Sequence, residues 1–420
     1  MDTTKTHTLI ARAYDCVPYY NHCINNRAEI DIDRLTIPDD FYKIPCFTKE
    51  TIKKIGWANF VDGRYLDEGY ELRDDRTLKV VRTSGTTQEA MRIPWRQADY
   101  YASIVNHWHF RQRRHGIQTT SRKLESILDM NGANAFTINL LSNTIKINLS
   151  AVVKNVRETL LNIRLFQPEW LYIQSSHLYL LLQLAERYKI PFPTSIRYIE
   201  LIGEPVLPYY LNTIRASFPE VSISNMYGCA ETNGIAYECS CHRLHILERN
   251  VYVEITDGGG GPVNGPGYIC VTGYHNHAMP FIRYRLNDRG ALHAAPCPCG
   301  NTSPVLELEM TRLPQIWMLP PRDAADMTLL YPYALFPAYE ESARDVWFQP
   351  DFTRFPDCRV TFFTKKATGE RRARIQETWT RLLETLGVRG FHFTCVFKTA
   401  VPDKQKVGLM RLSGWEAGGA

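Results

Sequence analysis

The chain has 420 residues, of which 44% are hydrophobic and 22% are charged. This composition is typical of a folded globular protein and argues against an intrinsically disordered chain, and the length favours about two or three domains. The net charge is +5, from 49 basic and 44 acidic residues. Such a balance does not require nucleic acid or an anionic membrane as a partner, and we expect neither.

The sequence carries no targeting or membrane-spanning pattern. No apolar run approaches the roughly 20 residues that a membrane helix needs, and residues 1–14 lack the basic and then apolar order of a signal peptide. We therefore expect a cytoplasmic protein. Its 11 cysteines are too sparse for a disulfide scaffold, so most are expected to be thiols, and closely spaced ones are candidate metal ligands.

The first 75 residues are polar and helical in pattern, with an amphipathic stretch at 8–14 and a helix start at 48–51. A short apolar strand at 79–81 then leads directly into 83–87, a loop of hydroxyl side chains around one glycine. Such a loop lets backbone N–H groups and hydroxyls approach a polyanion. On local grounds alone, an ordinary polar turn fits this segment equally well.

From residue 99 to residue 203, strand and helix patterns alternate. The predicted strands are 125–129, 145–147, 170–173 and 196–202. The predicted helices are 99–114, 152–166 and 176–188. Strands separated by helices of this length predict a largely parallel α/β core. The basic end of the first helix, at 111–114, is expected to be solvated.

Two further patterns follow along the chain. The β-rich runs 251–255 and 268–272 flank a tip rich in glycine and proline, which predicts a hairpin. A strand at 360–363, apolar residues at helical spacing over 375–386, and alternating aromatic residues over 391–397 predict a β-α-β unit. The expected fold class is α/β, with a hairpin-rich portion and a small C-terminal α+β lid.

Several segments, in chain order, resemble the adenylate-forming enzymes, and most closely their phenylacetate–CoA ligase branch. The segments are Val17–Tyr20 with Ile44–Lys49, Thr83–Thr87, Gly203–Pro205, Tyr227–Thr232 and Met279–Asp288. The resemblance covers about residues 8–312. It implies an N-terminal adenylation domain at 1–312, which binds ATP and an acid, and a lid domain at 313–420.

The resemblance also implies site residues. The phosphate loop would consist of Thr83, Ser84, Gly85, Thr86 and Thr87, and the adenine-contacting segments of Gly203, Glu204, Pro205, Tyr227, Gly228 and Thr232. In this assignment Tyr227 stacks on adenine, Glu231 holds Mg²⁺, and Asp288 accepts hydrogen bonds from the ribose hydroxyls. A carboxylate and substrate phosphates are ligands that suit Mg²⁺. The acid pocket would lie beside 131–136.

Adenylation builds negative charge on the α-phosphate, which a mobile lysine stabilises electrostatically. The family carries such a lysine near its C-terminus. Here Lys406 matches the family spacing better than Lys404, and Arg312 is a candidate contact to the ribose or phosphates. Thr83, Glu231 and Lys406 are therefore the expected catalytic residues.

The chain departs from the family pattern at two places. The family loop continues with Gly, Lys and Pro, whereas this chain has Gln88, Glu89 and Ala90. The loop lysine is therefore absent. The family hinge has Gly-Arg followed by acidic residues, whereas this chain has 311–315 in the order Thr-Arg-Leu-Pro-Gln. We therefore expect a weaker grip on the phosphates, and the acidic hinge that the family uses for rotation of the lid is absent.

A cluster of cysteine and histidine predicts a metal site. Cys239 and His245 precede a Cys-x-Cys turn, Cys297 and Cys299, by about fifty residues. Such a set supplies the four N/S ligands of a closed structural Zn²⁺ site, and some members of the resembling family carry one. Cys241 and His242 are alternative ligands, and buried free thiols are the alternative to a metal.

The sequence thus favours ATP-dependent activation of a small, by resemblance aromatic, carboxylic acid to its acyl-AMP, followed by transfer to CoA. An adenylating ligase that passes the acyl group to an amine or a carrier-protein thiol is the alternative. A zinc-bearing binding protein without catalysis is a third interpretation, and the presence of Glu231, Asp288 and Lys406 argues against it.

Overall fold

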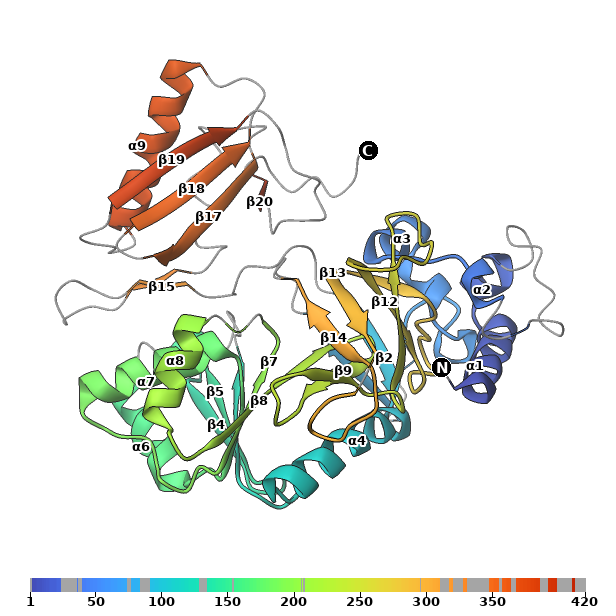
Figure 1. Ribbon diagram of the computed structural model, residues 1–420, viewed down its shortest axis with the longest axis horizontal. Helices are drawn as coiled ribbons and strands as arrows, with labels where there is room; N and C mark the ends of the chain where they lie inside the picture. The colour runs from blue at the N-terminus through green and yellow to red at the C-terminus, as the bar shows by residue number, and fades with distance from the viewer. Residues whose placement is uncertain are drawn as a thin grey trace.

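The structure is a computed structural model. It describes residues 2–23, 36, 40–73, 77–83, 91–127, 134–152, 155–204, 206, 208–294, 296–309, 317–319, 328–330, 347–354, 357–363, 368–385, 392–398 and 410–411. Within these residues the largest element is a mixed twelve-stranded sheet, with strand order β11-β12-β13-β14-β10-β9-β8-β7-β6-β3-β5-β4 (Figure 1).

One part of this sheet is parallel. Its strands are β3 (Lys123–Ile127), β5 (Thr144–Asn148), β6 (Trp170–Ile173), β7 (Tyr198–Ile202) and β8 (Ser222–Cys229), with β4 (Phe136–Asn139) antiparallel at the edge. Their connections include α5 (Leu149–Val152), α6 (Val156–Phe166), α7 (Ser175–Tyr188) and α8 (Pro208–Ser217). The predicted parallel α/β core is confirmed. The predicted helix 152–166 is wrong in one respect, because α5 ends at Val152 and α6 begins at Val156 after the non-helical Asn155.

The other part of the sheet is antiparallel. It comprises β9 (Asn233–Glu238), β10 (Leu244–Ile246), β11 (Val251–Thr256), β12 (Gly267–Gly273), β13 (Tyr284–His293) and β14 (Val305–Leu308). The predicted hairpin is β11–β12, whose six residue pairs run from Val251–Gly273 to Thr256–Tyr268. The change from parallel to antiparallel pairing occurs at β8–β9, so the turn between these strands lies where the two parts of the sheet meet.

Helices of the N-terminal region pack on the antiparallel part. They are α1 (Thr3–Cys16), α2 (Pro18–Cys23) and α3 (Lys49–Ile55). One short 3₁₀ turn, Phe41–Lys43, precedes α3, and two, Trp57–Phe60 and Gly63–Tyr65, follow it. Thr48 caps α3 in a reciprocal capping box with Thr51, which confirms the predicted helix start and satisfies two backbone donors. Phe47 and Phe60 belong to the same buried core as β12 and β13.

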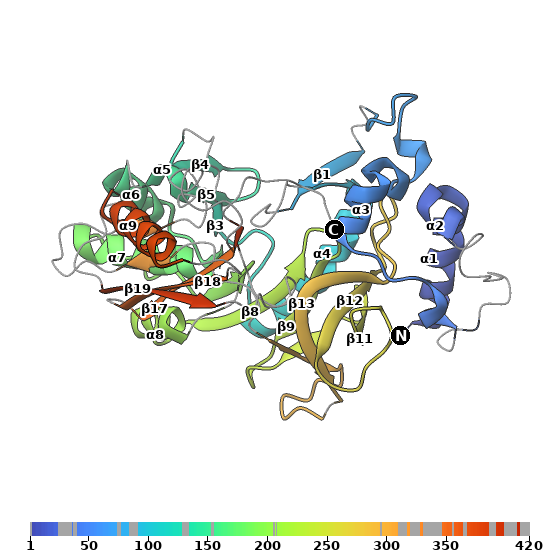
Figure 2. The ribbon, with the colours of Figure 1, turned by 90° about the horizontal axis from the view of Figure 1, so that it is seen from above.

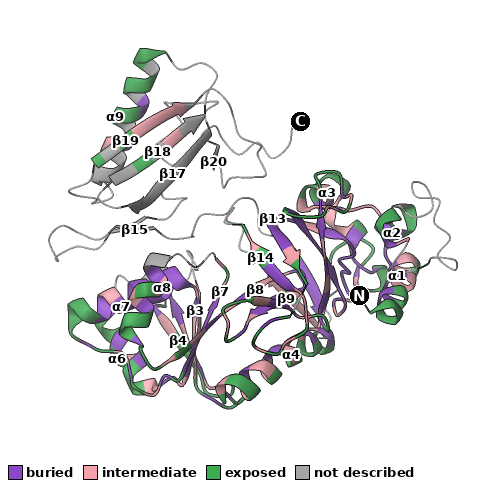
Figure 3. Cartoon of the chain, in the orientation of Figure 1, coloured by how far each residue is buried: buried purple, intermediate pink, exposed green. Residues whose placement is uncertain are grey.

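A hairpin and a long helix complete the larger part of the molecule. Strands β1 (Leu78–Arg82) and β2 (Arg92–Arg96) pair antiparallel, and residues 84–90 between them lie outside the described residues. Helix α4 (Gln97–His115) follows and ends at Gly116, whose φ of 64° is the left-handed conformation that favours glycine at a helix end. Figure 3 shows buried residues along both parts of the large sheet, which correspond to two separate hydrophobic clusters.

The C-terminal region forms a further sheet with the order β19-β18-β17-β20. Its strands are β17 (Trp347–Arg354), β18 (Asp357–Phe363), β19 (His392–Lys398) and β20 (Met410–Arg411), and α9 (Gly369–Thr385) connects the parallel pair β18 and β19. This arrangement confirms the predicted β-α-β unit, and Ile375 and Trp379 of α9 are buried. A small hairpin of β15 (Trp317–Leu319) and β16 (Thr328–Leu330) precedes it.

Helices long and apolar enough to cross a membrane are not found among the described residues.

Candidate functional site

A cleft of about 790 Å³ lies on the large sheet and gathers residues from distant parts of the chain. It is lined by Gly203, Glu204, Val206, Asn225, Met226, Tyr227, Gly228, His242, Arg243, Leu244, Asp288, His293, Val305, Leu306, Glu307, Leu308 and Glu309. Five of the predicted nucleotide contacts are among them. These five come from the turn after β7, from β8 and from β13, so three landmarks that are distant in sequence meet in one cleft.

The turn after β7 has a left-handed glycine followed by a carboxylate that accepts several hydrogen bonds. Gly203 has a φ of 75°, a conformation that costs glycine little and other residues more. The Glu204 carboxylate accepts hydrogen bonds from the Ser175 hydroxyl at 2.9 Å, the Ser176 backbone N–H at 2.7 Å and the Ser176 hydroxyl at 3.0 Å. A carboxylate is favourable at a helix N-terminus, so Glu204 anchors α7 and holds the turn in place.

Strands β8 and β13 bring Tyr227 and Asp288 together. The Tyr227 hydroxyl donates to the Asp288 carboxylate at 2.9 Å, and both residues line the cleft. Gly228 follows, and a Cβ at this position would lie 2.5 Å from the backbone oxygen of Asn233. The close approach of β8 and β9 at this point therefore requires glycine, which fixes the position of Tyr227 at the cleft.

Glu231 and Thr232 lie in the turn between β8 and β9 and are not among the residues that line the cleft. Glu231 is buried, and its carboxylate accepts a hydrogen bond from the Tyr284 hydroxyl at 3.0 Å. Burial, followed by the nearby Glu231 charge, raises the pKa of Tyr284 well above its usual value, so the tyrosine stays a donor. One oxygen of Glu231 is thus held in place, and its role as an Mg²⁺ ligand stays a prediction.

Thr83 follows β1 and is the one residue of the predicted phosphate loop that the structure describes. Its hydroxyl accepts from the Met91 backbone N–H at 2.8 Å and from the Lys49 ammonium at 3.3 Å. The remaining loop residues, Ser84, Gly85, Thr86 and Thr87, lie outside the described residues, as do Pro205, Arg312, Lys406 and 131–133. The roles assigned to these positions stay predictions.

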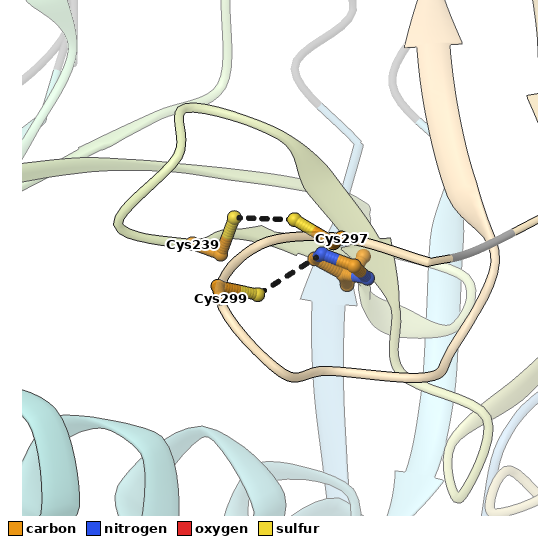
Figure 4. Close-up of side chains that lie close together, drawn as sticks. Cys239, Cys297 and Cys299 are labelled. Carbon is orange, nitrogen blue, oxygen red and sulfur yellow. Dashed lines mark hydrogen bonds between the residues drawn. The ribbon is translucent and has the colours of Figure 1, made fainter.

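The predicted metal ligands lie close together. The ligand atoms of Cys239, His245, Cys297 and Cys299 are all within 4.8 Å of one another. The Sγ atoms of Cys239 and Cys297 are 3.8 Å apart, and Sγ of Cys299 is 3.5 Å from Nε2 of His245 (Figure 4). Tetrahedral Zn²⁺ with Zn–S bonds of about 2.3 Å and a Zn–N bond of about 2.0–2.1 Å separates two sulfurs by about 3.8 Å, and sulfur from nitrogen by about 3.6 Å. The observed separations fit such a site.

The surroundings of these four residues also suit a metal. Nδ1 of His245 donates to the Ser303 carbonyl oxygen at 2.8 Å, which leaves Nε2 as the ligand atom in the way typical of metal-binding histidines. Backbone N–H groups of Cys241 and Asn301 donate to the sulfurs of Cys239 and Cys299 at 3.3 and 3.4 Å. Such donors stabilise thiolates, the form in which cysteine binds metals.

The alternative ligands Cys241 and His242 do not belong to the cluster. Nδ1 of His242 instead pairs with Glu238 at 3.0 Å, and the His242 side chain is largely exposed. The cluster joins the turn between β9 and β10 to the segment between β13 and β14. Since His242 and Arg243 of that turn and Leu244 of β10 line the cleft, a bound metal would brace one wall of it.

The expectation that residues 111–114 form a solvated helix end is wrong for Arg111. This side chain is buried, and its guanidinium donates to both oxygens of Glu200 on β7, at 2.8 and 2.5 Å. It also lies 4.8 Å from the ring centroids of both Trp108 and Trp170. Arg113 and Arg114 are exposed as predicted. Helical spacing places Arg111 four residues after the buried His107, and this periodicity is the signal that could have revealed its burial.

The sequence also gave no reason to place β14 at the cleft. Residues 305–309 line it because β14 pairs with both β10 and β13. Antiparallel pairing across such distances depends on register, which one sequence does not reveal. Arg243 and His293, which also line the cleft, were missed for the same reason.

No protein-family model matches the chain, and no curated protein matches it in sequence. Solved structures match in fold. The crystal structure of 2-hydroxyisobutyryl-CoA ligase in complex with 2-HIB-AMP and CoA, in the thioesterification state, has a TM-score of 0.63 at 16% identity and covers 96% of this chain and 87% of that chain. The same ligase in the postadenylation state, with R3-HIB-AMP, has a TM-score of 0.61 at 14% identity and covers 99% and 89%.

This likeness extends over nearly the whole chain and confirms the expected fold class. Membership of the adenylate-forming superfamily and of its phenylacetate–CoA ligase branch stays a prediction. The chain has the fold of the adenylate-forming acyl-CoA ligases.

Proposed function

We propose that the protein is an ATP-dependent, adenylate-forming ligase that activates a small carboxylic acid to its acyl-AMP. One observation carries the proposal: Gly203, Tyr227 and Asp288, which are expected nucleotide contacts from separate landmarks, line a single cleft of about 790 Å³. The fold, which matches that of a ligase crystallised with an acyl-AMP and CoA, supports the same conclusion.

Each side chain has a defined task in this proposal. Tyr227 offers a ring face to adenine. Asp288 accepts from the ribose hydroxyls, and the hydrogen bond from Tyr227 at 2.9 Å orients its carboxylate. Glu231 holds Mg²⁺, which would neutralise charge on the phosphates, and the Tyr284 hydroxyl orients Glu231 at 3.0 Å. Thr83 begins the loop that binds the phosphates.

The proposal extends to a lid and to its lysine. Residues 1–312 would form the adenylation domain and residues 313–420 the lid, from which Lys406 would reach the α-phosphate and stabilise the negative charge that adenylation creates. Arg312, at the boundary, would contact the ribose or the phosphates. Two of the expected catalytic residues, Thr83 and Glu231, are held by neighbouring side chains.

We propose CoA as the acyl acceptor, because the similar ligase was crystallised with CoA in the thioesterification state. An amine or a carrier-protein thiol is the second candidate, and the specific reason is that both the phosphate loop at 88–90 and the hinge at 311–315 depart from the family pattern. An aromatic acid, suggested by the phenylacetate–CoA ligase resemblance, and a short 2-hydroxy acid, suggested by the similar structure, are the first substrates to test.

We further propose that Cys239, His245, Cys297 and Cys299 bind a structural Zn²⁺. The four ligand atoms lie within 4.8 Å of one another, and they supply the complete ligand set of a closed tetrahedral site. Such a metal would hold the wall of the cleft and take no part in the reaction.

The decisive experiment is ATP–pyrophosphate exchange over a panel of aromatic, aliphatic and 2-hydroxy carboxylic acids. We expect exchange that depends on both ATP and one class of acid. Asp288→Ala should lower kcat/KM for ATP by about tenfold to 100-fold, because hydrogen bonds to a charged group are lost. Asn287→Ala is the matched control, since this exposed neighbour on β13 does not line the cleft and should exchange at the wild-type rate.

The outcomes separate the alternatives. Absence of exchange with every acid would contradict the ligase proposal and favour the non-catalytic binding protein. Where exchange occurs, AMP release that requires CoA identifies the acyl-CoA ligase. AMP release that requires an amine or a carrier protein identifies the second candidate.

A further inference from the structure

The start of the phosphate loop receives a lysine from a distant part of the chain. Lys49 is the first residue of α3, and its Nζ atom donates to the Thr83 hydroxyl at 3.3 Å, across 34 positions of sequence. Figure 2 shows α3 beside β1, the strand that leads to Thr83. The loop itself lacks the lysine of the family pattern and has Glu89 at the corresponding position.

In both of the side-chain hydrogen bonds that the structure gives for Thr83, the hydroxyl is the acceptor. A threonine hydroxyl has two acceptor lone pairs and one hydrogen to donate. The lone pairs accept from the Met91 backbone N–H at 2.8 Å and from Lys49 at 3.3 Å. These two bonds use only the acceptor capacity of the hydroxyl, so its hydrogen can still donate. A phosphate oxygen beside Thr83 would meet both this hydrogen and the Lys49 ammonium.

The backbone just before Lys49 is held in place by β13. Phe47 pairs with β13, since its N–H donates to the Arg283 carbonyl at 3.2 Å and its carbonyl accepts from the Arg285 N–H at 2.8 Å. Its ring packs against Tyr284 at a centroid distance of 5.2 Å, and Tyr284 donates to Glu231. The segment that carries Lys49 is therefore joined to the residue that orients the proposed Mg²⁺ ligand.

We propose that Lys49 binds the triphosphate of ATP and supplies, from the N-terminal region, the positive charge that the phosphate loop lacks. The inference rests on the proposed function and adds a nucleotide-binding residue to it. Lys49 and Thr83 act as one donor pair at the start of the loop. Thr48 caps the helix through Thr51, which fixes the backbone from which Lys49 extends.

The test removes the positive charge at position 49 and then introduces one at position 89. Lys49→Gln should lower kcat/KM for ATP in the exchange reaction by about 10²-fold, the loss typical of one removed electrostatic donor. It should also weaken Mg·ATP binding measured by calorimetry. Lys53→Gln, an exposed lysine on the same helix, is the matched control and should leave both unchanged.

Adding Glu89→Lys to Lys49→Gln should restore at least a tenth of the lost kcat/KM, because the charge returns at the family position. A purely structural role for Lys49 predicts no such rescue. Thermal unfolding of each variant checks that it is folded, and Lys49→Arg gives a second, charge-retaining comparison that should keep ATP binding.

The results separate this inference from the proposed function. If the wild type exchanges and Lys49→Gln equals it, the role of Lys49 is refuted while the ligase stands. If the wild type binds Mg·ATP in a Lys49-dependent manner but exchanges with no acid, the ligase is refuted and the nucleotide contact stands. If the wild type neither binds Mg·ATP nor exchanges, both are refuted.

Discussion

The proposed zinc site yields a prediction of coordination number, bond lengths and stability. The ligands would be three cysteine sulfurs and Nε2 of His245, and their separations of 3.8 Å and 3.5 Å match a tetrahedral ion. Purified protein should contain one zinc per chain. X-ray absorption should give sulfur at about 2.3 Å and nitrogen at about 2.0–2.1 Å in a three-to-one ratio.

Replacing one ligand should release the metal. We choose Cys299→Ser, because Cys299 is only partly buried and serine fits its space. At a free zinc concentration about 1,000 times Kd, the metal stabilises the folded state by about 4 kcal/mol, so the variant should lose about that much in urea-induced unfolding. Hydrogen exchange should increase in residues 239–246, since the turn that lines the cleft loses its brace.

Cys241→Ser is the control for this perturbation. Cys241 lies two residues from Cys239 but outside the cluster of ligand atoms, so its variant should keep one zinc and the wild-type stability. Stoichiometric zinc in Cys299→Ser, or loss of zinc from Cys241→Ser, would refute the assignment. The assignment would also be refuted if removing the metal from the wild-type protein left its free energy of unfolding unchanged.

Three further predictions concern the proposed catalytic lysine and two buried groups. Lys406→Ala should lower the rate of ATP–pyrophosphate exchange by orders of magnitude with little change in the KM for ATP, and an unchanged rate would remove it from the mechanism. Arg111→Met leaves the buried Glu200 carboxylate without its cation and should destabilise the protein by about 3–5 kcal/mol in urea unfolding. Adding Glu200→Gln to this variant should recover most of the lost stability. If the single and the double variant were equally stable, the argument would be contradicted. Burial lowers the pKa of His177 to about 3, below its unfolded value of about 6.5, so the stability that the neutral side chain contributes is present above about pH 6.5 and is lost as the pH falls. Between pH 7 and pH 5, the free energy of unfolding of the wild type should therefore fall by about 2 kcal/mol more than that of His177→Gln. Equal losses in the two proteins would refute this assignment.

The sequence determined the local features of this protein. Hydroxyl side chains at 48 and 51 suffice to start α3, because a capping box is formed by residues three apart. The alternation of apolar strands and helices was enough to predict the parallel α/β core. The order of the short landmarks was enough to predict the fold that the similar ligase has. The Cys-x-Cys turn, together with the Cys-to-His separation of the resembling family, also identified the four side chains that cluster.

Only the tertiary structure decided which distant groups meet. Arg111 appeared to be a surface charge, because its partner Glu200 is 89 positions away on β7. The carboxylate of Glu204, which lines the cleft, also accepts hydrogen bonds from Ser175 and Ser176 at the start of α7. Lys49 reaches Thr83 through the packing of the N-terminal segment on β13. The sequence shows which side chains are charged or can form hydrogen bonds. Which of them pair depends on sheet register and helix packing, and no short sequence pattern predicts these.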